Sequence, residues 1–171
     1  MGYTHYFRMP KGEMKEDKWN RLCKDVQTLV ENENYPVEKG YDKLDINEHR
    51  IIVRGTCEWL VIERKSVNRF NPKEDMVFNF CKTRHHAYDY VVVACLIALK
   101  RILPQVELSS DGDFTDWYEG ITHFTETIAL NHKEADSLSN AKSIKDIFSE
   151  LPLDLFAFNT ISDSTKGGEE E

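Results

Sequence analysis

Apolar positions follow a helical period in three segments of the chain. Residues 15–32 and about 115–130 carry apolar side chains at steps of three and four, which predicts two amphipathic helices. A third helix is predicted from about residue 84 to residue 102. It is apolar on almost every side, as is typical of a helix buried at the centre of a fold. Pro104 follows it and ends it, because proline cannot continue a helix.

Five short segments have the composition of β-strands, and turn residues separate them. Two of them, residues 50–54 and 58–64, flank Gly55-Thr56, which predicts a hairpin. The polar residues 31–45 predict an exposed connection. We therefore expect one α+β domain over residues 1–130, a mixed sheet of about five strands packed by a buried central helix and two amphipathic helices. The five strand segments are residues 3–8, 50–54, 58–64, 76–81 and 106–109.

Residues 131–171 form an acidic C-terminal appendage to this domain. They contain four lysines and nine acidic residues, a net charge of −5. Residues 143–151 predict a short helix, and the last ten residues, SDSTKGGEEE, predict a disordered end. Apolar side chains at 153–158 offer a contact to the domain or to a partner.

The composition excludes several classes of protein. No run of about 18 apolar residues is present, so we expect no membrane-spanning segment, and the N-terminus lacks the apolar core of a signal peptide. Four cysteines without a CxxC spacing indicate reduced thiols in a cytoplasmic protein, and their spacing argues against a structural zinc site. The net charge of −8 argues against binding to duplex DNA, which needs a basic face.

Against this acidic background, a cluster of basic residues follows the fourth strand. Lys82, Arg84, His85 and His86 precede the apolar helix, where the first peptide N–H groups lack partners and bind anions readily. We expect Lys82 and Arg84 to hold a phosphate group, with Thr83 donating a hydrogen bond to it. The two histidines are adjacent on the expected helix, so they face different directions and cannot both serve one small ligand.

Two less specific explanations of the basic cluster stay open. Thr83 has the residue type of a helix N-cap, which needs no ligand. Asp89, next to the cluster, can pair with Arg84 or Lys82 in a structural ion pair and neutralise it.

A second polar cluster, Ser110-Asp111-Gly112-Asp113, follows the last strand. Two carboxylates beside a glycine suit a divalent cation, the hydroxyls of a ribose, or general acid–base chemistry. The alternative is a plain turn in which Asp113 caps the next helix. This cluster meets the basic residues only if the topology folds the last strand back towards them.

The first strand carries Tyr3, His5 and Tyr6. In a strand, Tyr3 and His5 point to one side while Thr4 and Tyr6 point to the other. Aromatic side chains beside a basic pocket can stack a nucleotide base, and His5 has the residue type of a general acid or base. The alternative is an edge strand whose aromatic residues fill the core.

Three segments carry a distinctive combination of motifs: GYTHYF at residues 2–7, FNFCKTRHHAYDYVVVACLIALK at 78–100 and SSDGDFTDW at 109–117. Together they resemble a family of small proteins of uncharacterised activity from phages, other large DNA viruses and bacteria. The resemblance covers residues 2 to about 118 and implies membership without implying an activity. Members carry Lys-Pro-Tyr-Asp where this chain has His86-Ala87-Tyr88-Asp89.

The leading hypothesis is a protein that binds a phosphorylated, nucleotide-like small molecule. The ligand would contact Tyr3, His5, Tyr6, Lys82, Thr83, Arg84, Ser110, Asp111 and Asp113. The resemblance to phage and viral proteins implies sequestration of a host signalling nucleotide, a form of immune evasion in the host cytoplasm. No cofactor or metal is expected for such a binder, and a homo-oligomer is compatible with the sequence.

Two alternatives use the same chain differently. A metal-assisted phosphoesterase or related hydrolase would use His5 or His85 as acid–base, with Asp111 and Asp113 holding a divalent cation. A protein-interaction module would act through the apolar residues 153–158 of the tail.

Overall fold

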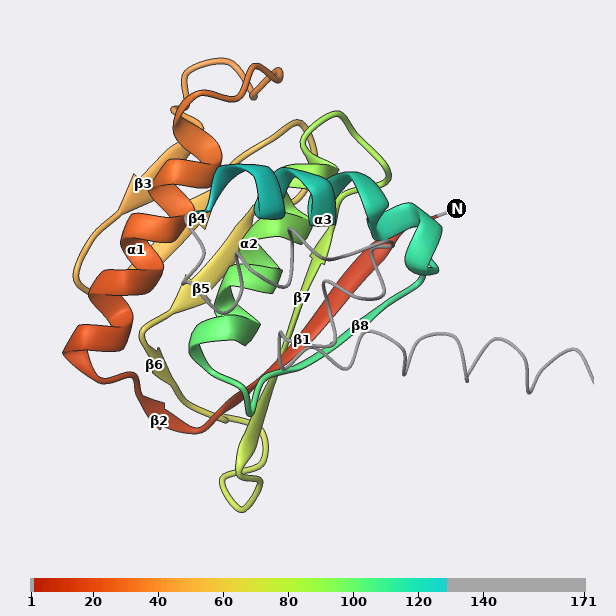
Figure 1. Ribbon diagram of the computed structural model, residues 1–171. Coiled ribbons are helices and arrows are strands. Elements are labelled where there is room, and N and C mark those ends of the chain that lie inside the picture. The colour runs from red at the N-terminus through yellow and green to blue at the C-terminus, as the bar shows by residue number, and fades with distance from the viewer. Residues whose placement is uncertain (1, 129–171) are drawn as a thin grey trace, which may run out of the picture.

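The computed structural model describes residues 2–128, which form an α+β domain, as the sequence predicted (Figure 1). Each of the three predicted helices and five predicted strands is present, with ends shifted by a few residues. The elements in chain order are β1 Thr4–Pro10, β2 Gly12–Glu13, α1 Glu16–Glu31, β3 Leu44–Ile46, β4 Arg50–Val53, β5 Leu60–Glu63, β6 Lys65–Ser66, β7 Met76–Lys82, α2 Asp89–Ile102, β8 Glu107–Ser110 and α3 Phe114–Thr127.

The strands form three small antiparallel sheets, so the predicted single sheet of about five strands is not confirmed. One sheet has the order β7-β1-β8, a second has β3-β4-β5, and β2 pairs with β6. The hairpin expected around Gly55-Thr56 is present as β4 and β5. The prediction that residues 31–45 are only an exposed connection is wrong at its end, because Leu44 and Asp45 pair with β4 as part of β3.

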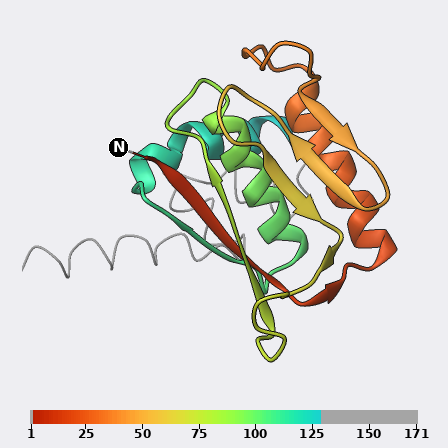
Figure 2. The ribbon, with the colours of Figure 1, turned by 180° about the vertical axis from the view of Figure 1, so that it is seen from behind.

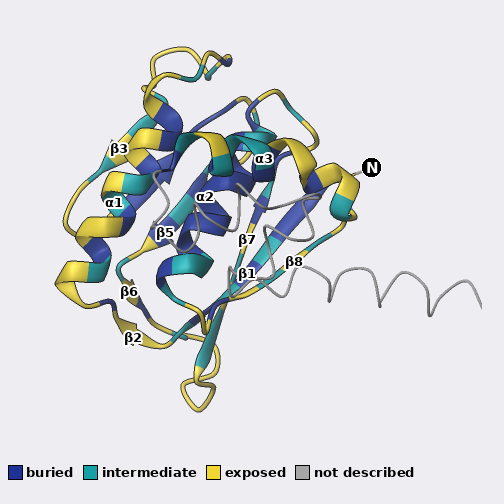
Figure 3. Cartoon of the chain, in the orientation of Figure 1, coloured by how far each residue is buried: buried dark blue, intermediate teal, exposed yellow. Residues whose placement is uncertain are grey.

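Helix α2 lies at the centre of the core, which confirms the predicted buried helix (Figure 3). Every residue from Val91 to Leu99 has a relative exposure of 0%. The two amphipathic helices, α1 and α3, pack against it. Gly120 allows α3 to approach α2 closely, since a Cβ atom at residue 120 would lie 2.4 Å from Val93 of α2. Seen from behind, the strands lie in front of the helices, which therefore cover one side of the sheets (Figure 2).

The start of α2 differs from the prediction. The helix begins at Asp89 and not near Arg84, because residues 83–88 form turns. The N–H of His86 donates to the carbonyl of Thr83, and the N–H of Asp89 donates to the carbonyl of His86. Arg84 and His85 have φ angles of 53° and 57°, in the left-handed region that an α-helix cannot use.

The C-terminal appendage, with its predicted helix at 143–151 and its apolar residues at 153–158, lies outside the described residues. Within residues 2–128, no helix is long and apolar enough to cross a membrane. All four cysteines are free thiols. Burial raises the pKa of the Cys81 and Cys95 thiols well above the ordinary value.

Candidate functional site

The central strand of the β7-β1-β8 sheet brings the three motif-bearing segments together. His5 on β1 lies opposite Cys81 on β7 and opposite Ser110 on β8. Thr4 lies opposite Lys82, at the point where β7 passes into the turns before α2. The last strand therefore does return to the basic cluster, with β1 between the two.

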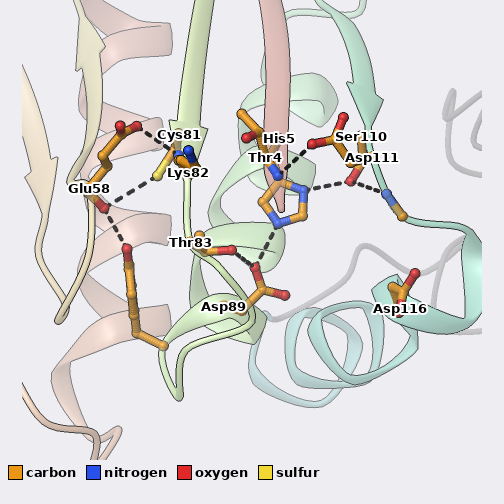
Figure 4. A network of polar contacts seen from close by, with 12 residues as sticks. Thr4, His5, Glu58, Cys81, Lys82, Thr83, Asp89, Ser110, Asp111 and Asp116 are labelled. Carbon is orange, nitrogen blue, oxygen red and sulfur yellow. Dashed lines mark hydrogen bonds and ion pairs between the residues drawn. The ribbon is translucent and has the colours of Figure 1, made fainter. Parts of the chain in front are cut away.

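His5 is the centre of a polar network at this end of the sheet (Figure 4). Its side chain has an exposure of 0%. The Nε2 atom lies 2.7 Å from Asp89 Oδ1, and the Nδ1 atom lies 3.0 Å from Ser110 Oγ. The ring also makes edge contacts with Tyr3 and Trp117, at centroid distances of 5.0 Å and 5.3 Å. Both nitrogens of a wholly buried imidazole are thus satisfied by side chains from distant parts of the chain.

Asp89, the first residue of α2, is engaged by this network and not by the basic cluster. Its Oδ1 atom accepts hydrogen bonds from His5 and from the hydroxyl of Thr83. A carboxylate at this position also interacts favourably with the helix dipole. The ion pair with Arg84 or Lys82 that the sequence left open is therefore absent among the described residues.

The residues from Lys82 to His86, which we call the basic loop, lie beside the network. Arg84 and His85 are exposed, Lys82 and His86 are partly exposed, and Thr83 is fully buried. In the described part of the chain, neither Lys82 nor Arg84 forms an ion pair through its side chain. His86 Nδ1 contacts the hydroxyl of Thr56 at 2.8 Å.

The backbone of the basic loop is not an open cradle for phosphate. The N–H groups of Thr83 and Arg84 both donate to the carbonyl of Tyr3, at 3.1 Å each. The Thr83 hydroxyl points inward to Asp89. The amides of Thr83 and Arg84 are therefore not open to an anion, which the side chains of Lys82 and Arg84 would hold at this loop.

Tyr3 links the basic loop to the turn after β8. Its ring stacks on the His85 ring at a centroid distance of 3.5 Å. Its hydroxyl lies against Gly112, where a Cβ atom would be 2.5 Å from the Tyr3 oxygen and 2.6 Å from an Asp116 carboxylate oxygen. Burial, and then the charges of Asp89 and Asp116, raise the pKa of Tyr3 above its ordinary value.

The two carboxylates of the Ser110–Asp113 turn have separate tasks. Asp111 accepts hydrogen bonds from the Thr4 N–H and the Tyr6 hydroxyl, both at 3.0 Å. Burial and the Asp111 carboxylate raise the pKa of Tyr6. Asp113 caps α3 through the N–H groups of Thr115 and Asp116, so the capping explanation is confirmed. No group of three or more metal-ligating side chains occurs in residues 2–128.

The site also contains residues that the sequence did not single out. Glu58 lies in the connection between β4 and β5, and its carboxylate accepts from the Lys82 N–H at 3.0 Å. Its carbonyl accepts from the Tyr88 hydroxyl at 2.5 Å. Trp117 covers His5 from α3. Nothing in the local pattern marks Glu58, whereas Trp117 is a buried position of an amphipathic helix.

Comparisons with protein-family models, with curated proteins and with solved structures found no match to this chain.

Proposed function

We propose that the protein binds a phosphorylated, nucleotide-like small molecule at the basic loop. One observation supports this most strongly: Asp89 is the nearest carboxylate along the chain, and it is used by His5 and Thr83. Lys82 and Arg84 therefore keep their charge available. Two neighbouring cations whose side chains have no carboxylate partner within residues 2–128, on a chain with a net charge of −8, favour an anionic ligand.

The backbone of the loop is a second argument for a binding role. Left-handed φ angles in two consecutive residues other than glycine cost roughly 1–2 kcal/mol each. Such strain persists where the surrounding structure holds it, and it is common at ligand-binding sites. Here the strained turn directs Arg84 and His85 outward. Stability alone would favour glycine at both positions.

The nucleotide-like character of the ligand rests on the stacked rings. His85 is exposed and lies flat on Tyr3, whose buried ring holds it in place. A base can stack on the outer face of such a ring while Arg84 and Lys82 hold the phosphate. Sequestration of a host signalling nucleotide in the cytoplasm is the biological role that the resemblance to phage and viral proteins favours.

The metal-assisted hydrolase has weaker support. Asp113 is committed to the start of α3, and Asp111 to Thr4 and Tyr6. Neither carboxylate meets a histidine in a cluster suited to a metal ion within the described residues.

The protein should be incubated with a panel of nucleotides and cyclic nucleotides, with and without Mg²⁺, then heated and deproteinised. Pure binding returns the compound chemically intact, whereas products that form without Mg²⁺ would indicate that metal-independent turnover follows binding. Native mass spectrometry of the same samples shows which compound is bound. Appearance of products that depend on Mg²⁺ would contradict pure binding, and the absence of any bound compound would contradict the proposal itself.

A further inference from the structure

Ser110, His5 and Asp89 form a continuous chain of hydrogen bonds from the end of β8 to the start of α2 (Figure 4). The distances are 3.0 Å from Ser110 Oγ to His5 Nδ1 and 2.7 Å from His5 Nε2 to Asp89 Oδ1. Serine, imidazole and carboxylate in this order are the groups that activate a serine hydroxyl for attack on an electrophile.

The contacts determine where the protons lie. A carboxylate only accepts hydrogen bonds, so a neutral His5 ring must carry its proton on Nε2 to bond Asp89. Its Nδ1 is then an acceptor, and the Ser110 hydroxyl donates to it. Thr83 strengthens this arrangement, because its hydroxyl also donates to Asp89 Oδ1 and holds the carboxylate in place.

Ser110 lies at the end of its strand and is partly exposed. His5, to which it bonds, is fully buried, and Asp89 is partly exposed on the other side of the ring. The N–H of Gly112 donates to Ser110 Oγ at 3.1 Å, which orients the oxygen. The base behind the hydroxyl is fully buried, so a reagent would approach from the partly exposed Ser110 side.

We propose that Ser110 is a nucleophile towards phosphoryl esters, with His5 as its general base and Asp89 as the residue that positions His5. Ser110 Oγ forms a bond to phosphorus, its proton passes to His5 Nδ1, and the ester oxygen leaves with that proton. A water molecule then attacks the phosphorus and gives its proton to His5 Nδ1, which returns a proton to the Ser110 oxygen as the Oγ–P bond breaks. The choice of a phosphoryl group rests on the proposed function, but the reactivity of Ser110 does not.

A fluorophosphonate probe tests this reactivity without a nucleotide. The Ser110 oxygen displaces fluoride from phosphorus, and the adduct is located by peptide mass spectrometry on the full-length protein. We expect one adduct, on Ser110, and none in Ser110→Ala. Ser109→Ala, the neighbouring exposed serine, is the matched control and should be labelled like the wild type.

Asp89→Asn tests the positioning role. The amide can donate to Nε2 and so favours the wrong tautomer, which should slow labelling by about 10²–10⁴-fold. The ¹⁵N shifts of His5 report this independently: protonated Nε2 and bare Nδ1 in the wild type, and the reverse in Asp89→Asn. A merely structural Asp89 would leave the labelling rate of the folded variant unchanged.

An unlabelled wild-type protein, or an adduct at another residue, would overturn the proposal, and neither result depends on whether a variant folds. Such a failure is distinct from failure of the proposed function. An unlabelled Ser110 with nucleotide still bound through Lys82 and Arg84 would indicate a binder without nucleophilic chemistry.

Discussion

His5 Nε2 lies 2.7 Å from Asp89 Oδ1 and joins the first strand to the start of the central helix, 84 residues further along the chain. Asp89→Ala removes the acceptor of both His5 and Thr83, two groups with no exposure. We expect it to lower the free energy of unfolding by about 2–5 kcal/mol in urea denaturation.

Glu107→Ala is the matched control for this prediction. It breaks the ion pair between Glu107 and Arg8. The Arg8 side chain is 44% exposed and the Glu107 side chain is 57% exposed. An exposed pair of this kind should contribute no more than about 1 kcal/mol. Equal destabilisation by the two substitutions would show that the His5 network is not a principal stabilising contact.

Arg84 separates the stability of the basic loop from its function. Arg84→Gly relieves the left-handed φ of 53°, whereas Arg84→Ala keeps it. We expect the free energy of unfolding of the glycine variant to be about 0.5–1 kcal/mol higher than that of the alanine variant. Both variants lose the guanidinium group, so both should bind a phosphorylated ligand equally weakly. A glycine variant less stable than the alanine variant would argue against the strained turn.

Gly55 is required by the packing of Tyr88. A Cβ atom at residue 55 would lie 2.2 Å from the Tyr88 ring, which is fully buried and bonded to Glu58 through its hydroxyl. Gly55→Ala should therefore destabilise the fold by about 1–3 kcal/mol, as overpacking does in other cores. Thermal unfolding measures this, with the exposed Ser109→Ala as the control. A neutral Gly55→Ala would mean that Tyr88 is free to move.

Buried tyrosines should make the fold sensitive to alkali. Burial raises the pKa of Tyr3, Tyr35 and Tyr88 above the ordinary value. An unfolded chain releases these protons near pH 10, whereas the folded chain keeps them. Their contribution to stability is complete below about pH 10 and is lost above it, by up to about 1.4 kcal/mol per pH unit for each tyrosine.

The loss of stability in alkali can be checked by following tyrosine absorbance and circular dichroism together. The useful range is about pH 9 to pH 12, which spans the ordinary tyrosine pKa. Above about pH 10, the slope of the free energy of unfolding against pH should fall in Tyr88→Phe by the contribution of about one proton. Tyr118→Phe, which removes a hydroxyl at a position 51% exposed, is the matched control. Ionisation of all tyrosines before unfolding would contradict the burial of these three rings.

The helices were predictable because their signal is local. The spacing of Trp19, Leu22 and Val26 defines α1, and the continuous apolar run defines α2 as a buried helix. Sheet partners were not predictable in this way, because β1 pairs with strands more than 65 residues away. Three residues, Leu44–Ile46, are also too few to show strand periodicity within a polar segment.

The start of α2 depends on a contact that the local pattern does not contain. The carbonyl of Tyr3 accepts from the N–H groups of Thr83 and Arg84, so the chain turns there instead of beginning a helix. The same strand pairing places His5 within hydrogen-bond distance of Asp89. Sequence patterns could nominate His5, Ser110 and Asp89 as polar residues of interest, but only the pairing of β1 with β7 and β8 brings them into one network.

Binding of a phosphorylated compound through Lys82 and Arg84 is tested most directly by calorimetric titration of the nucleotide panel. The full-length wild type should be compared with Lys82→Ala/Arg84→Ala and with Arg21→Ala/Lys24→Ala, which removes the same charge from an exposed part of α1. We expect at least one compound to bind the wild type and the α1 variant with equal affinity. Its affinity for the loop variant should be at least about tenfold weaker, which corresponds to about 1.4 kcal/mol. Equal affinity for all three proteins, or no binding to the wild type, would contradict the proposal.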